Sequence, residues 1–222
     1  MVTWPADARD LTRVQQALGQ AHPARWQPPA TPRIGACFVC FDRGAQGATD
    51  QGVAAATVVH GRRLLADVTV SGRAGGHYLP ALLALREGPL LEAAVRALPA
   101  APDVLLVNAT GRDHPRRAGL ALQLGAVVGL PTVGVTTRPL AGGGAWPADQ
   151  RGAIAPLLLG GELVGYWLRT RQGAKPVAVH AAWRTDARAA VEVVLAATRR
   201  VRTPEPLRRV RTLARTARAQ RR

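Results

Sequence analysis

The sequence is short of lysine and of acidic residues, and it has no long apolar run. Lys175 is the only lysine among 30 basic residues, against 14 acidic ones. No stretch of about 18 uninterrupted apolar residues occurs, so we expect no membrane span. The first residues, MVTWPADARD, lack a basic segment followed by an apolar core, so we expect no signal peptide and a cytoplasmic protein.

Cysteine is also scarce. Cys37 and Cys40 form one C-x-x-C spacing inside an apolar run, but no second pair follows and the five histidines are scattered. Such a spacing can be a redox pair or half of a zinc site, and a zinc site needs further Cys or His ligands. The two thiols are therefore expected to be buried in a strand.

The net charge of +16 is carried almost entirely by arginine. GC-rich coding explains why arginine replaces lysine, but it does not explain 30 basic residues against 14 acidic ones. Such an excess predicts attraction to polyanions, with nucleic acid as the first candidate. With 222 residues, 47% of them hydrophobic, the chain is long enough for a sizeable core.

The periodicities alternate between strand and helix. Helices are expected over 7–20, 79–98, 116–129 and 186–198, strands over 30–42, 52–60, 62–72, 102–108, 131–136 and 176–183, and a hairpin over 155–170. Gly88-Pro89 is expected to break or kink the second helix after Glu87. Three meander strands followed by strand–helix units predict an α/β fold, a mixed sheet flanked by helices, in a single domain over 1–202 with a basic tail over 203–222.

The C-terminal segment holds most of the charge. Residues 199–222 contain ten arginines and one acid, Glu205, and so carry +9 of the +16. After the two prolines at 204 and 206, Leu207, Val210 and Leu213 recur at helical spacing. This pattern predicts a short amphipathic helix with a basic face; the alternative is a frayed tail. Either form adds phosphate affinity that weakens with salt.

Five motifs, in order along the chain, resemble those of the endonuclease V family. They are IGACFVCFD (34–42), HYLPALLALRE (77–87), VNATGRDHPRRAG (107–119), LPTVGVTTRPLAG (130–142) and PEP (204–206). The family comprises metal-dependent nucleases that cut near deaminated adenine (inosine) in nucleic acid. The resemblance implies a ribonuclease H-like fold, a Mg²⁺ or Mn²⁺ cofactor and a DNA or RNA partner.

The departures from the family pattern fall on its metal site. The family's first-strand aspartate falls on Phe38, and the aspartate that ends its central strand falls on Asn108, whereas the glutamate after the wedge is retained as Glu87. A family lysine falls on Thr137. Mg²⁺ prefers hard, anionic oxygen ligands, and metal-assisted hydrolysis depends on the ion. The sequence therefore predicts impaired catalysis.

Two acidic residues are candidates to rebuild a metal site beside Glu87. On an extended strand the side chain of Asp42 points to the same face as that of Phe38, but four residues of strand separate the two by roughly 13 Å. Asp113 lies in the loop after Asn108 and is the better candidate. A rearranged active site through Asp113 stays open at this point.

The binding residues of the family pattern are better retained. Tyr78, Leu79 and Pro80 match the wedge that, in the family, inserts at the lesion and fills the gap left by a flipped base. The alternative is that Tyr78 and Leu79 begin a packed helix.

The central loop supplies the remaining candidates. His114, Arg116 and Arg117 are expected to line the pocket floor and contact phosphates, or, for the two arginines, to be solvated charges at a helix start. Backbone amides around Gly111 are expected to hold the edge of hypoxanthine.

Three classes of function stay open. The residues favour a nucleic-acid-binding protein of endonuclease V type with impaired catalysis. The alternatives are an active deoxyinosine endonuclease of DNA repair with a rearranged metal site, and an interaction protein on the same fold. The missing carboxylates argue against the first alternative, and the retained wedge and the basic tail argue against the second. We expect a monomer.

Overall fold

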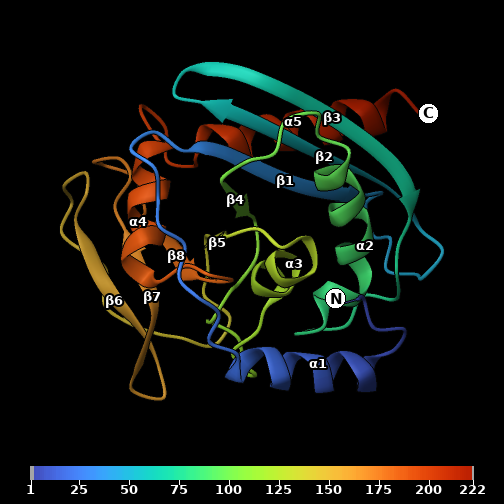
Figure 1. The fold of residues 1–222 in the computed structure, drawn as a ribbon, viewed down its shortest axis with the longest axis horizontal. Coiled ribbons are helices and arrows are strands. Elements are labelled where there is room, and N and C mark those ends of the chain that lie inside the picture. The colour runs from blue at the N-terminus through green and yellow to red at the C-terminus, as the bar shows by residue number, and fades with distance from the viewer. Residues whose placement is uncertain (1–2, 222) are drawn as a thin grey trace.

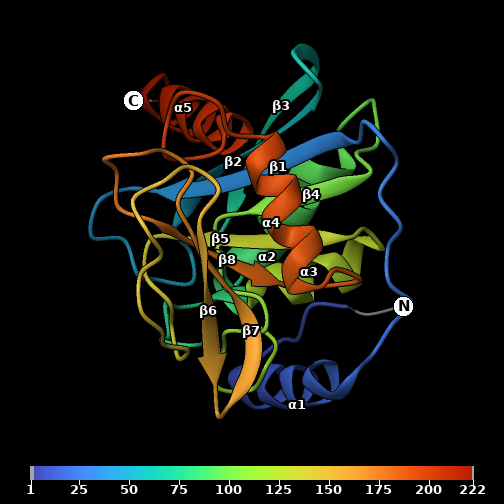
Figure 2. The same cartoon turned by 90° about the vertical axis from the view of Figure 1, so that its left-hand side faces the viewer.

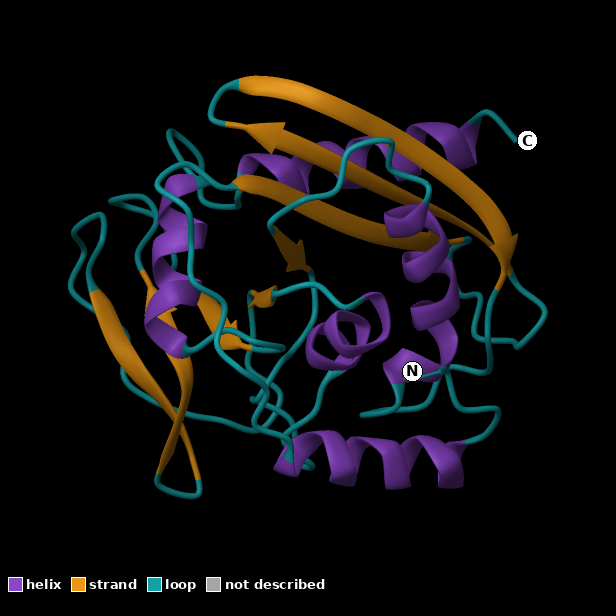
Figure 3. Cartoon of the chain, in the orientation of Figure 1, coloured by secondary structure: helices purple, strands orange, loops and turns teal. Residues whose placement is uncertain are grey.

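The computed structural model describes residues 3–221, and Figures 1 and 3 show a sheet covered by helices on both faces. The helices are α1 (Ala8–Gln20), α2 (Leu83–Arg96), α3 (Leu120–Val128), α4 (Ala187–Ala196) and α5 (Glu205–Ala219). The strands are β1 (Arg33–Phe41), β2 (Gln51–His60), β3 (Arg63–Arg73), β4 (Val104–Val107), β5 (Thr132–Thr136), β6 (Ile154–Leu159), β7 (Glu162–Leu168) and β8 (Val177–Ala181).

The eight strands form one mixed sheet in the order β3-β2-β1-β4-β5-β8-β7-β6. The β1–β2–β3 meander is antiparallel, β4 pairs in parallel with both β1 and β5, and the remaining strands are antiparallel. The predicted α/β class, with a mixed sheet flanked by helices in a single domain, is confirmed. The hairpin over 155–170 is also confirmed, with Gly160 and Gly161 at positive φ in its turn.

The two faces of the sheet bury two separate apolar clusters. Cys37 of β1 and Leu105 of β4 pack with α1, α2 and α3, whereas Ala36 and Leu106 pack with α4 and α5 on the other face. This follows from the period of two along a strand, which sends successive side chains to opposite faces. Figures 1 and 2 place α1 and α5 at opposite ends of the molecule.

Of the break or kink expected at Gly88-Pro89, the break is wrong, because α2 runs as one helix from Leu83 to Arg96 through Pro89. Proline has no N–H to donate to the carbonyl four residues back. The nearby loop covers this turn: the Gly75 N–H donates to the Arg86 carbonyl at 3.0 Å. A Cβ at Gly75 would lie 2.3 Å from the Leu85 carbonyl oxygen, so only glycine allows this close approach.

The helix predicted over 116–129 begins later than expected, at Leu120. Arg117 has a φ of +59°, which is incompatible with a right-handed helix, and its N–H donates to the His114 carbonyl at 2.7 Å. The segment 114–117 is therefore a tight turn, and Arg116 and Arg117 extend from that turn.

The basic C-terminal segment is a helix that packs on the sheet. Leu207, Val210 and Ala214 of α5 are fully buried against the cluster on the α4–α5 face. At one flank Arg209 forms a bidentate ion pair with Asp67 of β3. The predicted amphipathic helix is thus present, with its apolar stripe in the core. Within residues 3–221, no helix is both long and apolar enough to cross a lipid bilayer.

Candidate functional site

The predicted catalytic positions lie where β4 ends beside β1. The last residue pair between these strands is Cys37 with Val107, so Phe38 and Asn108 follow at the same level. Beyond this level β1 continues without β4 as a neighbour, which leaves a gap at the carboxyl ends of the parallel strands. Ligands of open α/β sheets bind at such ends. Helix α2 approaches the gap from one face and α5 from the other.

A cavity of about 90 Å³ occupies this gap. The three positions that the family pattern assigns to the metal surround it together, and its lining residues are Cys37, Phe38, Val39, Leu83, Glu87, Leu91, Val107, Asn108 and Leu120. Thr137 does not take part, because it is exposed beyond the end of β5. Its neighbours Thr136 and Arg138 line an adjoining pocket instead.

Glu87 lies in mostly apolar surroundings. Burial raises the pKa of its carboxyl to about 8, against a smaller lowering by the positive charge of Arg86. The Cys37 thiol is a neighbour on the same face, and burial, together with the charge of Glu87, raises its pKa. The one retained carboxyl is therefore mainly neutral at pH 7.

The raised pKa of Glu87 predicts a pH-dependent stability. Because this pKa lies above its ordinary value of 4.5, the protonated Glu87 carboxyl favours the folded state. Its full contribution to the free energy of unfolding is present below about pH 4.5 and is lost as the pH rises to about 8. Glu87→Gln keeps the shape and cannot ionise. Thermal melts from pH 4.5 to 8 are expected to show the variant gaining stability relative to wild type as pH rises. Two parallel curves would contradict the assignment.

A guanidinium group of α5 contacts the site from the other face. Nη2 of Arg211 donates to Oδ1 of Asn108 at 2.5 Å. The guanidinium carbons of Arg211 and Arg215 lie 5.7 and 6.0 Å from the centroid of the Phe38 ring. Sequence reasoning missed Arg211 as a site residue. Its only signal was its place in a helical arginine pattern, which does not show what it faces.

The residues at this gap do not fit a divalent metal ion. Phe38 offers no ligand atom, the Asn108 oxygen already accepts a bond from a cation, and Glu87 favours its protonated form. Two guanidinium groups also repel a cation. Nowhere in residues 3–221 do three or more His, Cys, Asp or Glu side chains gather as a metal site.

Asp113 is buried away from the cavity and holds a neighbouring loop. Its carboxylate accepts backbone N–H bonds from Leu140 at 2.7 Å, from Ala141 at 3.1 Å and from Gly142. The His180 ring lies 3.7 Å away. Asp42 lies at the end of β1, with its carboxylate 3.9 Å from Nε of Arg218. Both acids thus have structural partners, and neither lines the cavity.

The adjoining pocket, of about 340 Å³, has two of the three wedge residues, Tyr78 and Leu79, in its lining. Tyr78 is 46% exposed and Leu79 38% exposed, and Pro80 is exposed as well. Because α2 begins only at Leu83, these side chains do not start a packed helix. The pocket is lined by Gln15, Tyr78, Leu79, Ala81, Leu83, Ala84, Asn108, Ala109, Thr110, His114, Leu120, Thr136, Arg138, Pro139 and Leu140. Asn108 and two leucines border both cavities.

The wedge is anchored through the carbonyl of Ala81, whose φ is +59°. This oxygen accepts from Nε2 of His114 at 2.9 Å, from Nη2 of Arg116 at 3.3 Å and from Nε2 of Gln15 at 3.3 Å. Nδ1 of His114 accepts from the Arg116 N–H, and burial lowers the pKa of the imidazole, so a neutral ring with its proton on Nε2 fits both bonds. His114 and Arg116 therefore position the wedge.

Arg117 and Gly111 face other parts of the molecule. Arg117 donates to the Leu159 carbonyl at 2.7 Å and lies 3.1 Å from Glu162, so it ties the central loop to the β6–β7 hairpin. A Cβ at Gly111 would lie 2.2 Å from the Ala181 carbonyl oxygen, so this glycine permits close packing on β8. Gly111 does not line the wedge pocket.

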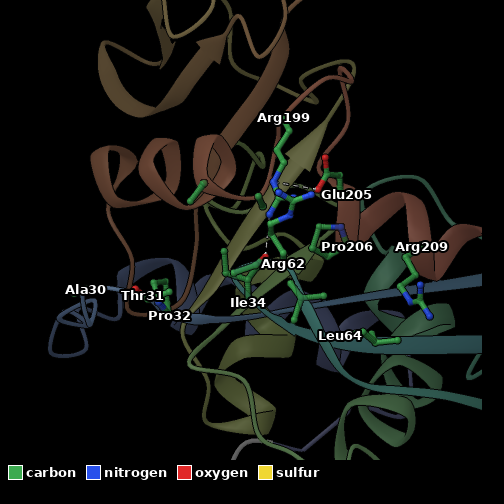
Figure 4. A pocket seen from close by; sticks show the side chains of 14 residues that line it. Ala30, Thr31, Pro32, Ile34, Arg62, Leu64, Arg199, Glu205, Pro206 and Arg209 are labelled. Atoms are coloured by element: carbon green, nitrogen blue, oxygen red, sulfur yellow. Dashed lines mark hydrogen bonds and ion pairs between the residues drawn. The ribbon is translucent and has the colours of Figure 1, made fainter.

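Another hollow, of about 310 Å³, lies at the opposite end of β1, between the β2–β3 turn and the start of α5 (Figure 4). Ile34 and Pro206 are on its wall, and Arg199 pairs with Glu205 across 3.8 Å. None of the predicted site residues lines it. The candidate site is therefore the wedge pocket together with the small cavity beside Asn108.

Comparison with known proteins identifies the family of the chain. The family model "Endonuclease V" matches residues 20–211. An endonuclease V of Streptomyces avermitilis is 40% identical over 220 residues, covering 96% of this chain and 93% of that protein. The crystal structure of an endonuclease V from Streptomyces avermitilis has a TM-score of 0.89 at 38% identity, covering 98% of this chain and 95% of that one.

A more distant structure shows the same fold. It is Ciona intestinalis endonuclease V in complex with a 24-mer DNA containing an inosine followed by a ribo-adenosine. Its TM-score is 0.78 at 19% identity, covering 96% of this chain and 98% of that one. The expected ribonuclease H-like fold is thus confirmed. The family match spans most of the chain, including the wedge, the central loop and the first half of α5 up to Arg211, and the chain therefore belongs to the endonuclease V family.

Proposed function

We propose that this protein binds inosine-containing nucleic acid and does not cut it at the rates of a metal-loaded endonuclease V. The observation that carries the proposal is that a pocket for a base and a site without metal-binding carboxylates lie next to each other. An exposed wedge borders a base-sized pocket, and the strand ends next to that pocket carry Phe38 and Asn108 in place of carboxylates. DNA or RNA as the partner, the monomeric state and the cytoplasmic location stay predictions.

The wedge pocket supports the binding half of the proposal. Tyr78 and Leu79 expose an aromatic and an aliphatic group on a loop that Ala81 anchors, so they can fill the space that a flipped base leaves. The Ciona relative of the same fold was crystallised with inosine-containing DNA. The excess of arginine supplies affinity for phosphates that does not depend on sequence.

The small cavity supports the second half of the proposal, that the protein does not cut the nucleic acid at the rates of a metal-loaded enzyme. Metal-assisted hydrolysis uses the ion both to form the nucleophile and to neutralise developing charge. In a family member that binds Mg²⁺ or Mn²⁺, anionic oxygens hold this ion. Here the only carboxyl at the cavity is Glu87, whose pKa is raised to about 8.

The test is a pair of assays on matched oligonucleotides, one with a single inosine and one with adenine. With Mg²⁺ or Mn²⁺, binding is expected to favour the inosine strand, and nicking is expected to stay at background. Robust metal-dependent nicking near the inosine, abolished by Glu87→Ala, would instead establish the active enzyme with a rearranged site. No binding to either oligonucleotide would favour the interaction protein.

Tyr78→Ala is expected to lower the preference for inosine while leaving the salt dependence of binding unchanged. Contacts to bases determine which sequence is preferred, whereas contacts to phosphates place the protein on the nucleic acid and set the salt dependence. The wedge is therefore expected to affect only the preference for inosine. The measurement is a salt titration of binding to both oligonucleotides. Leu163→Ala, an exposed leucine on β7 away from the wedge pocket, is the control. An equal loss for both oligonucleotides would show that Tyr78 does not read the lesion.

A further inference from the structure

Three arginines of α5 share one flank of the helix. Arg208, Arg211 and Arg215 are three and four residues apart, which places them on one side of an α-helix. Arg211 and Arg215 both lie over Phe38, at the gap where β4 ends. On the opposite flank Arg209 pairs with Asp67 of β3. The flank of Arg211 therefore faces the candidate site, and that of Arg209 faces away from it.

Arg211 and Arg215 lack the acidic partners that surface arginines usually find. In residues 3–221 neither forms an ion pair, whereas Arg209 and Arg218 of the same helix both do. Burial lowers the pKa of Arg211, and the neighbouring charge of Arg215 lowers it further. Two guanidinium groups that repel each other at a half-buried place are stabilised when an anion lies between them.

The donors of this pair suit a phosphate group. Arg211 uses Nη2 for Asn108, and its Nε–H is buried without a partner among the described residues. Arg215 is exposed beside the Phe38 ring, so a ligand can reach it from solvent. Guanidinium groups bind phosphate oxygens through charge-assisted, often bidentate hydrogen bonds. A neutral amide, an aromatic ring and two guanidinium groups thus make a site for an anion.

The position of Asn108 connects this site to the base pocket. Its side chain accepts from Arg211, and the residue lines both the small cavity and the wedge pocket. A phosphate at Arg211 and a base in the wedge pocket would therefore lie on either side of one residue.

From this geometry we infer that Arg211 and Arg215 form a phosphodiester-binding site that supplies, from the chain itself, the positive charge that a divalent cation supplies in other members of the family. The inference rests on the proposed function, because the phosphodiester belongs to the bound nucleic acid. It adds that binding needs no metal and depends on these two side chains.

The test is fluorescence anisotropy on a labelled inosine-containing DNA duplex, in EDTA and in Mg²⁺. Wild-type affinity is expected to be the same in both within about twofold. Arg211→Ala is expected to weaken binding by about 10- to 100-fold, as the loss of a charge-assisted hydrogen bond implies. The slope of log affinity against log salt is expected to fall by about 0.9 for the lost phosphate contact. Arg211→Lys restores the charge and is expected to recover the slope better than the affinity.

Arg209→Ala is the matched control, because it removes the same charge from the same helix on the flank that faces β3. Its slope and affinity are expected to stay near wild type. Should Arg211→Ala fail to fold, Arg215→Ala tests the same site at an exposed side chain. Binding that requires Mg²⁺, or a folded Arg211→Ala with an unchanged slope, overturns the inference. A wild-type protein that binds no duplex in either buffer overturns the proposed function instead.

Discussion

A chain carrying Phe38→Asp, Asn108→Asp and Arg211→Ala is expected to bind Mn²⁺, whereas a chain with only the first two changes is not. In the double variant the carboxylate introduced at position 108 faces Arg211, which already donates to that side chain at 2.5 Å. An ion pair between them would occupy the oxygens that a metal needs. Removing the guanidinium leaves two new carboxylates beside Glu87, a ligand set that suits a hard divalent cation.

Isothermal titration calorimetry with Mn²⁺ on the wild type and both variants is the measurement. The triple variant buries charge where an aromatic ring packed, so without metal we expect it to be less stable than the wild type by roughly a few kcal/mol. Adding Mn²⁺ is expected to restore this stability, because the ion binds only the folded state. Tight binding by the double variant would show that Arg211 does not compete with a cation. A folded triple variant that binds no metal would show that Phe38 and Asn108 are not the ligand positions.

Leu207→Ala is expected to destabilise the protein by about 2–5 kcal/mol, the usual cost of truncating a buried leucine. Leu207 is fully buried, and it packs with Val210 and Ala214 against the sheet face below α5. Chemical denaturation gives the free energy of unfolding. Leu163→Ala removes the same atoms from a side chain that is 47% exposed, and it is expected to change stability by less than about 0.5 kcal/mol.

The same packing changes what a deletion of the C-terminal segment would measure. Removing residues 201–222 takes away eight arginines and one glutamate, but it also uncovers the apolar face of β1 and β2. Weaker nucleic-acid binding after such a deletion would report on folding and on charge together. If Leu207→Ala left stability unchanged, α5 would not contribute to the core. The deletion would then measure the effect of the C-terminal charges on nucleic-acid binding alone.

Several features of the fold and the site could be predicted from the sequence because they are local or repeat with a fixed period. The alternation of strand and helix patterns predicted the α/β sheet. The order of the motifs predicted the family and placed Phe38, Glu87 and Asn108 at one site, and the structure gathers these three residues around one cavity. The replacement of two carboxylates, at Phe38 and Asn108, stays a prediction from the resemblance to the family.

Other features depend on contacts between residues far apart in the chain, which no local pattern specifies. Helix α2 runs through Pro89, and the Gly75 N–H of a loop before the helix donates to the Arg86 carbonyl in the same turn. His114 and Arg116 hold the wedge because the positive φ of Ala81 turns its carbonyl toward them. These contacts decide which of the predicted site residues line the wedge pocket and which support the loop beside it.

The sequence by itself thus determined the fold class and the family, since periodicity and motif order carry that information, and it predicted the loss of two anionic ligands. Only the tertiary structure decided which side chain faces Asn108. Arg211 lies 103 residues from Asn108 in the chain, and its charge reaches that site because the apolar stripe of α5 packs on the sheet in one orientation. Helical spacing alone shows which side chains share a face. The burial of Leu207 and Val210 determines where that face points.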